Sequence, residues 1–186
     1  MATGPAARSL VEVRLLDGLV HSLAFANPET ALGGKFLSTP WSDVGTALQV
    51  SAYSLASLTM ACKPLLVEPA SVVGLTFDAT VSWPVYDWMG VSKAALESTT
   101  RYLAFELGEK KIRLNTLSAG PVRTLSAMAV GGIDEMFAHV EKKAPLKRNI
   151  DGDEVGKAAV NLLSDLSSGI TGQNLYVDAG FSIVGI

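Results

Sequence analysis

Two patterns of hydrophobic and polar positions alternate along the chain. Short continuous apolar runs, typical of strands buried in a parallel sheet, lie at 19–25, 71–77, 113–118 and 174–177. Stretches of helix-forming composition lie at 42–62, 84–107, 124–142 and 153–166. Because strands and helices alternate in this way, the sequence predicts an α/β fold with a doubly wound parallel sheet.

The beginning of the chain has a different pattern. Residues 1–8 are mostly small, whereas apolar and charged residues alternate over 11–15. That alternation predicts a short half-exposed strand, and the Asp-Gly pair at 17–18 predicts a turn after it. We therefore expect a single domain, in which 1–15 form a flexible or short-strand extension and 16–186 form the folded part.

Composition narrows the possible functions. The formal net charge of −3 gives no sign of nucleic-acid binding, and no apolar run approaches the roughly 18 residues that a membrane span needs. Cys62 is the single cysteine, and His21 and His139 lie far apart in the sequence. We therefore expect a cytoplasmic protein with no disulfide framework, no metal site, and no nucleic-acid or membrane partner.

The helical stretch that begins near Pro84 carries the clearest chemistry. Tyr86 and Lys93 are seven residues apart, so two turns of helix place both on one face. An ammonium stabilises phenolate and can bind a ligand hydroxyl, and a phenol can donate a hydrogen bond to a developing oxyanion. A lone pair of this kind is more often a half-buried aromatic residue and a solvated charge, and both interpretations stay open at this point.

A turn after the next apolar run supports the functional interpretation. The run at 112–118 is followed by Ala119, Gly120 and Pro121. In open α/β sheets, ligands bind at the carboxyl ends of the strands, and a Gly-Pro turn presents backbone groups there.

Together these motifs resemble the enoyl-acyl-carrier-protein reductases of bacterial fatty-acid synthesis, a branch of the short-chain dehydrogenase/reductase superfamily. The resemblance runs from about residue 16 to the C-terminus. It depends on the six residues that separate Tyr86 from Lys93 and on Ala-Gly-Pro-x-Arg-Thr at 119–124. It implies reduction of trans-2-enoyl thioesters of acyl-carrier protein by hydride from NADH, with NADPH left open, and a homotetrameric enzyme.

The resemblance also assigns roles to residues. Tyr86 would hydrogen-bond the enolate oxygen, and Lys93 would bind the hydroxyls of the nicotinamide ribose. Other cofactor contacts would come from Ser22, Ala24, Gly120, Pro121, Val122 and Thr124. The substrate pocket would include Phe77, with Met128, Met136 and Phe137 on a helical lid. An ordinary core position is the alternative for each of these apolar residues.

Basic residues gather after the predicted lid. They are Lys142, Lys143, Lys147 and Arg148. Because acyl-carrier proteins are acidic, this cluster would suit carrier docking, although such clusters are more often merely solvated.

One part of the family pattern is absent from the 186 residues. They contain no G-x-G-x-x-G or related Gly-rich loop. We therefore expect an N-terminally truncated sheet that lacks the first βαβ units and exposes the edge of the 19–25 strand. Three alternatives stay open: a fragment of an enoyl reductase, a catalytically impaired remnant acting as an interaction or regulatory subunit, and a ketoreductase. The spacing of Tyr86 and Lys93 argues against the ketoreductase, since three intervening residues are common there.

Overall fold

The computed structural model describes residues 15–124 and 133–185. In this part of the chain, four parallel strands form one sheet in the order β1-β2-β3-β4. They are β1 (Leu16–His21), β2 (Leu66–Thr76), β3 (Ile112–Ala119) and β4 (Asn174–Val177). The expected parallel α/β fold is confirmed.

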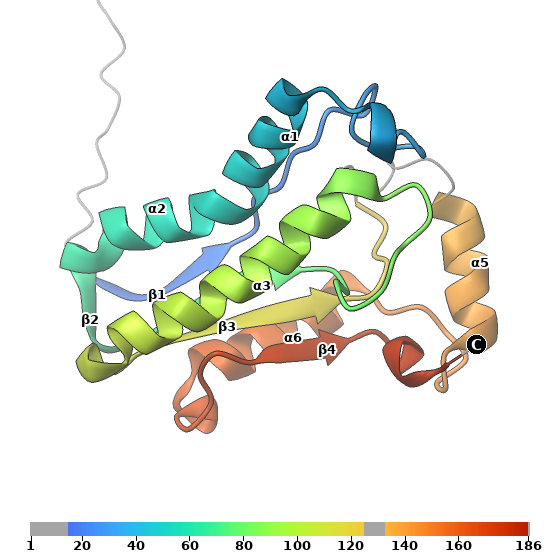
Figure 1. The fold of residues 1–186 in the computed structure, drawn as a ribbon. Coiled ribbons are helices and arrows are strands. Elements are labelled where there is room, and N and C mark those ends of the chain that lie inside the picture. Colours follow the sequence, from blue (N-terminus) through green and yellow to red (C-terminus); the bar gives the residue numbers. More distant parts are fainter. Residues whose placement is uncertain (1–14, 125–132, 186) are drawn as a thin grey trace, which may run out of the picture.

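Helices cover both faces of the sheet (Figure 1). They are α1 (Trp41–Leu48), α2 (Ser54–Cys62), α3 (Asp87–Leu107), α5 (Ile133–Lys143) and α6 (Gly152–Leu163). Successive strand residues point to opposite faces, so Val72 packs in the core under α2 and α3, whereas Val73 packs with Leu162 of α6. Helix α5 lies beyond the carboxyl edge of the sheet (Figure 1).

The first strand differs from the prediction. It spans Leu16–His21 instead of 19–25, and the predicted turn at 17–18 lies inside it. The pairing register with β2 shifts between Leu16 and Gly18. A Cβ on Gly18 would lie 3.0 Å from the Ser71 carbonyl oxygen. Glycine at this position therefore permits a close approach of the β1 backbone to β2, whereas the Asp-Gly pair in the sequence had predicted a turn. The strand predicted at 11–15 falls almost entirely outside the described residues.

Two other boundaries also differ. Strand β2 starts at Leu66, earlier than the predicted 71. The helix predicted at 42–62 is divided by a π-helical turn, Gln49–Tyr53, and its N-cap is Pro40 with no side-chain hydrogen bond. By contrast, Asp151 caps α6 with its side chain, in a capping box with Glu154.

The edge of β1 is open in the described part of the chain, where β2 is its single strand neighbour. Val20 on this strand is 47% exposed, and an exposed apolar edge favours pairing with another strand. Of the helices in the described residues, none combines the length and the apolar character that crossing a membrane requires.

Candidate active site

The predicted ligand-binding segments meet at one edge of the sheet. The strands are parallel, and the register pairs His21 with Gly74 and Thr76 with Ser118. Their carboxyl ends therefore lie side by side, close to the first turn of α3 (Figure 1). This is the edge at which open α/β sheets bind ligands.

Tyr86 lies at the N-terminal boundary of α3. Its own backbone dihedral angles are helical (φ −87°, ψ −22°), whereas Asp87, the first residue of α3, has φ 44°. The side chain is half-buried, and desolvation raises the pKa of the phenol above its ordinary value. Among the described residues, the hydroxyl has no hydrogen-bond partner. Tyr86 is thus a neutral phenol that can donate to a ligand, which favours a hydrogen-bonding role over a phenolate.

Lys93 is buried on the same helix, with 7% of its surface exposed. Its Nζ donates to the Leu75 carbonyl at 3.0 Å. Desolvation lowers the pKa of the ammonium to about 8, and the Glu97 carboxylate partly opposes this shift. The alternative of a solvated charge is wrong. An ammonium has three donors, and within the described residues one of them is used, so two can reach a ligand.

Phe77 joins Tyr86 to a row of aromatic rings. Its ring meets the Tyr86 ring edge-on at a centroid distance of 5.2 Å and lies 5.0 Å from the Trp83 ring. Trp83 lies 5.6 Å from Phe181, near the end of the chain. Such ring pairs attract each other, so the row restrains Phe77 and Tyr86. No sequence pattern indicated that Trp83 and Phe181 would meet.

Asp78 is a buried carboxylate just after β2. Its Oδ1 accepts hydrogen bonds from the hydroxyls of Thr80 (2.6 Å) and Tyr176 (3.1 Å), and its carbonyl accepts from the Trp83 indole at 2.9 Å. It therefore ties the segment that leads into α3 to strand β4. Sequence reasoning missed Asp78, although an acidic residue just after a strand of a parallel sheet is a usable signal.

Gly120 and Pro121 follow β3 at the predicted place. A Cβ on Gly120 would lie 3.1 Å from the Asp178 Cα, so glycine allows the ends of β3 and β4 to approach closely. Gly120, Pro121 and Phe77 line one small cavity of about 10 Å³. The structure thus brings the Gly-Pro turn and Phe77 together, next to Tyr86.

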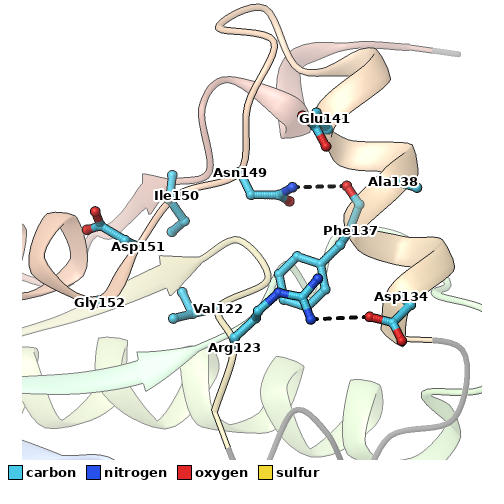
Figure 2. A pocket seen from close by; sticks show the side chains of 10 residues that line it. All are labelled: Val122, Arg123, Asp134, Phe137, Ala138, Glu141, Asn149, Ile150, Asp151 and Gly152. Carbon is cyan, nitrogen blue, oxygen red and sulfur yellow. Dashed lines mark hydrogen bonds and ion pairs between the residues drawn. The ribbon is translucent and has the colours of Figure 1, made fainter.

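A larger cavity of about 460 Å³ lies beside Val122, between α5 and the start of α6 (Figure 2). The Arg123 guanidinium lies over the Phe137 ring, 4.4 Å from its centroid, and 3.3 Å from the Asp134 carboxylate. The Asn149 side-chain amide donates to the Phe137 carbonyl at 3.1 Å. These contacts attach α5 to the chain that leaves β3.

The predicted substrate-pocket residues do not gather in one cavity. Phe77 lines the small cavity at Gly120, whereas Phe137 is buried and lines the larger one. Met136 is half-buried on α5, and Met128 lies outside the described residues. Thr124 is exposed and ends the first described range.

Ser22 and Ala24, predicted to contact the cofactor, follow β1 and are exposed. Their segment is fastened to the π-helical turn Gln49–Tyr53. The Ser51 hydroxyl accepts from the Phe25 amide (2.9 Å) and donates to the Phe25 carbonyl (3.0 Å). Turns of this type occur often at functional sites, and this one holds a predicted cofactor segment.

His21 is fully buried at the end of β1. Its Nε2 lies 2.7 Å from the Ser54 hydroxyl. Burial lowers the pKa of the imidazole, and the positive charge of Lys93 lowers it further. His21 is therefore a neutral side chain in the packed interior.

Comparison with known families identifies this arrangement. The sequence profile described as Enoyl-(Acyl carrier protein) reductase matches residues 6–182. The chain belongs to the enoyl-(acyl carrier protein) reductase family. The resemblance seen in the Tyr86–Lys93 helix and the Gly-Pro turn is thereby confirmed, and the family assignment favours an enoyl reductase over the ketoreductase alternative.

Relatives within the enoyl-(acyl carrier protein) reductase family use either dinucleotide, according to their names. The chain is 52% identical over 172 residues to the NADH-dependent enoyl-[acyl-carrier-protein] reductase FabI of Nostoc sp., a match that covers 92% of this chain and 66% of the relative. It is 47% identical over 174 residues to the NADPH-dependent FabI of Staphylococcus aureus, covering 93% of this chain and 68% of that protein.

Solved structures of the same family show the same fold. The Bacillus cereus enoyl-acyl carrier protein reductase, solved with NADP⁺ and indole naphthyridinone, superimposes with a TM-score of 0.91 at 40% identity, covering 94% of this chain and 68% of that chain. The Aquifex aeolicus enzyme gives a TM-score of 0.88 at 39% identity, covering 92% and 67%. The chain thus spans about two thirds of the length of the reductases that it matches.

Proposed function

We propose that these residues form the catalytic part of a reductase that converts trans-2-enoyl-acyl-carrier-protein thioesters to acyl thioesters with NADH, in the cytoplasm. One observation carries the proposal: a half-buried neutral phenol, Tyr86, caps the helix that carries a buried ammonium, Lys93, at the ligand-binding edge of the sheet. Family membership of the chain supports it. NADPH is the alternative cofactor, as in the Staphylococcus aureus relative.

The described residues fit a dinucleotide in its nicotinamide half. Lys93 keeps donors for ribose hydroxyls, because one of its three is used within the described residues. A bound reduced nicotinamide supplies the hydride that reaches the β-carbon of the enoyl thioester. Backbone groups at Val122 would orient the carboxamide.

Tyr86 would act at the other end of the conjugated system. As hydride would add to the β-carbon, negative charge would move onto the thioester oxygen, and the enolate would then take a proton from water at its α-carbon to give the acyl thioester. The Tyr86 hydroxyl would donate a hydrogen bond to that oxygen, and such preorganised donors stabilise the charge of the transition state. Phe77 would exclude water from this side, since its ring contacts Tyr86.

The test is substrate-dependent oxidation of NADH by a fused reductase. In this protein, the 186 residues are joined to the N-terminal segment of the Nostoc relative, which supplies the Gly-rich loop. Oxidation with trans-2-enoyl thioesters, and none with 3-ketoacyl thioesters, would support the proposal. Activity on the 3-ketoacyl substrate alone would instead show a ketoreductase.

A second candidate is a non-catalytic subunit. In the described part of the chain the edge of β1 is open, and this favours the candidate because an exposed apolar edge can pair with another chain. An inactive fused reductase that retains a native fold would support this candidate.

Replacing Lys93 with alanine is expected to weaken NADH binding to the fused reductase at least about tenfold, because one charge-assisted hydrogen bond contributes roughly 1.5–3 kcal/mol. In the parent protein, the affinity should fall as the pH rises through about 8, the pKa of this ammonium, because the amine then loses its charge. Calorimetric titration with NADH across this range measures both effects. Arginine at position 93 should not restore binding, since it cannot reproduce a compact point charge.

Lys110 offers a matched control. It lies after α3, at the amino end of β3, where it pairs with Glu68 at 3.2 Å. Lys110→Ala should leave both the affinity and its pH dependence unchanged. An unchanged affinity in Lys93→Ala would contradict the ribose-binding role.

We further propose that basic residues after α5 steer the acidic carrier protein. Lys142 and Lys147 are exposed, whereas Arg148 is held by Glu154 through two hydrogen bonds of 2.7 Å and therefore contributes less free charge. Reversing the charge at Lys143 and Lys147 to glutamate should lower kcat/KM for a carrier-bound enoyl thioester, by a factor that shrinks with added salt.

The steering hypothesis requires a difference between two substrates. A carrier-free enoyl thioester should react at the parent rate with the doubly reversed variant. The same charge change at Lys110 and Lys111, on the opposite edge of the sheet, should spare both reactions. Equal slowing of both substrates would show that the basic residues are structural.

Self-association is also part of the proposal. Large apolar side chains are exposed on α2 and α3 and the turn before them, namely Tyr53, Met60, Tyr102 and Phe105. Where exposed apolar side chains gather, they mark an interaction surface, and this exposure is compatible with the homotetramer that the family resemblance implies.

A further inference from the structure

The loop after β1 is attached to the start of α3 around Tyr86. Two backbone amides of this loop, those of Gly34 and Lys35, donate to Oδ2 of Asp87 at 2.7 and 2.8 Å. The amide of Gly33 donates to the carbonyl of Val85 at 2.9 Å. The residues on either side of Tyr86 are therefore both bonded to the same short segment, residues 33–36.

Trp88 adds a third attachment. Its indole N–H donates to the Phe36 carbonyl at 3.0 Å, and its ring stacks on the Phe36 ring at a centroid distance of 4.8 Å. In Figure 1, the segment that precedes α1 lies next to the first turn of α3. Backbone, carboxylate and ring contacts thus all join residues 33–36 to residues 85–88.

The backbone on both sides of Tyr86 is in an unfavourable conformation. Val85 has φ 61° and Asp87 has φ 44°, in the left-handed region that β-branched residues in particular avoid. Such conformations persist where surrounding contacts over-determine them, and they cluster at functional sites. The contacts to residues 33–36 are the ones that hold Val85 and Asp87.

We propose that Asp87 is a positioning residue for Tyr86: by binding the amides of Gly34 and Lys35, its carboxylate holds the strained turn that aims the Tyr86 hydroxyl into the active site. This inference rests on the proposed function for the role of Tyr86, but the positioning itself is a property of the chain. The segment also follows the predicted cofactor contacts at 22–24, so the same attachment joins the cofactor side of the site to the phenol.

Asp43 is a carboxylate with which Asp87 can be compared. It binds the other end of the same loop, accepting from the Asn27 amide at 3.2 Å and from the Thr30 hydroxyl, and it lies on α1 and makes none of the contacts at 85–88. If Asp87 served only to order the loop, loss of either carboxylate would have similar consequences. If Asp87 positions Tyr86, the two losses differ.

The experiment measures ionisation of Tyr86 in the 186-residue chain by ¹³C NMR of ring-labelled tyrosine, assigned with Tyr86→Phe. In the parent chain, burial raises the pKa of this phenol above the ordinary tyrosine value. In Asp87→Ala, water should reach the released ring, and the ionisation constant should increase at least about tenfold. Asp87→Asn, which keeps an oxygen acceptor, should recover most of the parent behaviour, and Asp43→Ala should match the parent.

Trp88→Phe provides a second, milder test, because it removes the hydrogen bond to Phe36 and keeps an aromatic ring. It should increase the ionisation constant of Tyr86, as Asp87→Ala does, and it replaces the alanine variant if that variant does not fold.

In the fused reductase, Asp87→Ala should lower kcat with little change in KM for NADH. Unchanged ionisation of Tyr86 in both folded variants, or an equal effect of Asp43→Ala, would overturn the proposal. The titration needs no turnover, so an inactive enzyme would count against the proposed function alone.

Discussion

Replacing Tyr86 with phenylalanine is expected to lower kcat of the fused reductase by roughly 10–1000-fold, the loss typical of one oxyanion donor. The ring would stay in contact with Phe77, so packing is kept and the hydroxyl alone is lost. Because the hydroxyl meets the enolate oxygen and not the cofactor, NADH affinity should barely change. Single-turnover kinetics with a trans-2-enoyl thioester, together with calorimetric titration of NADH, measure the two quantities separately.

Tyr176 is a suitable control for this substitution. Its hydroxyl lies in the same region but already donates a hydrogen bond to the Asp78 carboxylate at 3.1 Å. Tyr176→Phe should therefore lower the stability of the fold somewhat and leave the rate of the chemical step nearly unchanged. A loss of NADH affinity in Tyr86→Phe as large as the loss in kcat would make Tyr86 a structural residue.

A polypeptide of these 186 residues alone is expected to bind NADH no more tightly than about millimolar and to reduce enoyl thioesters little or not at all. Dinucleotide binding in this architecture depends on backbone N–H groups at a Gly-rich loop aimed at the pyrophosphate. The sequence contains no loop of that spacing. Two missing charge-assisted bonds amount to about 3–6 kcal/mol, which is roughly a hundredfold to ten-thousandfold in affinity.

The fused reductase tests this expectation directly. Calorimetric titration of NADH should show recovered affinity in the fused protein and a weak signal for the 186 residues, with both proteins folded. The open edge of β1 is where the added segment would pair. Micromolar NADH binding by the 186 residues alone would contradict the expectation and would indicate that residues 1–15 or a second copy complete the binding site.

Much of the candidate site could be predicted because its signals are local in the sequence. The spacing of Tyr86 and Lys93 depends on helix geometry alone, and the Gly-Pro turn depends on where an apolar run stops. Gly120 is an example: the turn predicted at its position is also a place where the ends of β3 and β4 approach closely. The cap of α6 is a local signal too, because Asp151 and its partner Glu154 are three residues apart in the sequence.

Other features escaped prediction because they depend on residues brought together by folding. Lys93 is buried because the end of β2 packs against its helix and accepts its hydrogen bond. From the sequence alone, a lysine is expected to be a solvated charge. The π-helical turn could not be predicted, because its residues fit the same hydrophobic period as an ordinary α-helix. Phe137 was assigned to the same pocket as Phe77, yet the two line different cavities, and sequence order does not reveal which cavity a side chain enters.

Sequence patterns were sufficient to predict the class of fold and the family and to single out Tyr86 and Lys93 as candidate site residues, since apolar periodicity and short motifs are properties of neighbouring residues. The tertiary structure decided how that pair behaves. Burial at the sheet edge sets the pKa of Lys93 near 8 and keeps Tyr86 protonated, because desolvation depends on what surrounds a group in space. The attachment of Asp87 to Gly34 likewise exists only once the loop after β1 has folded against α3.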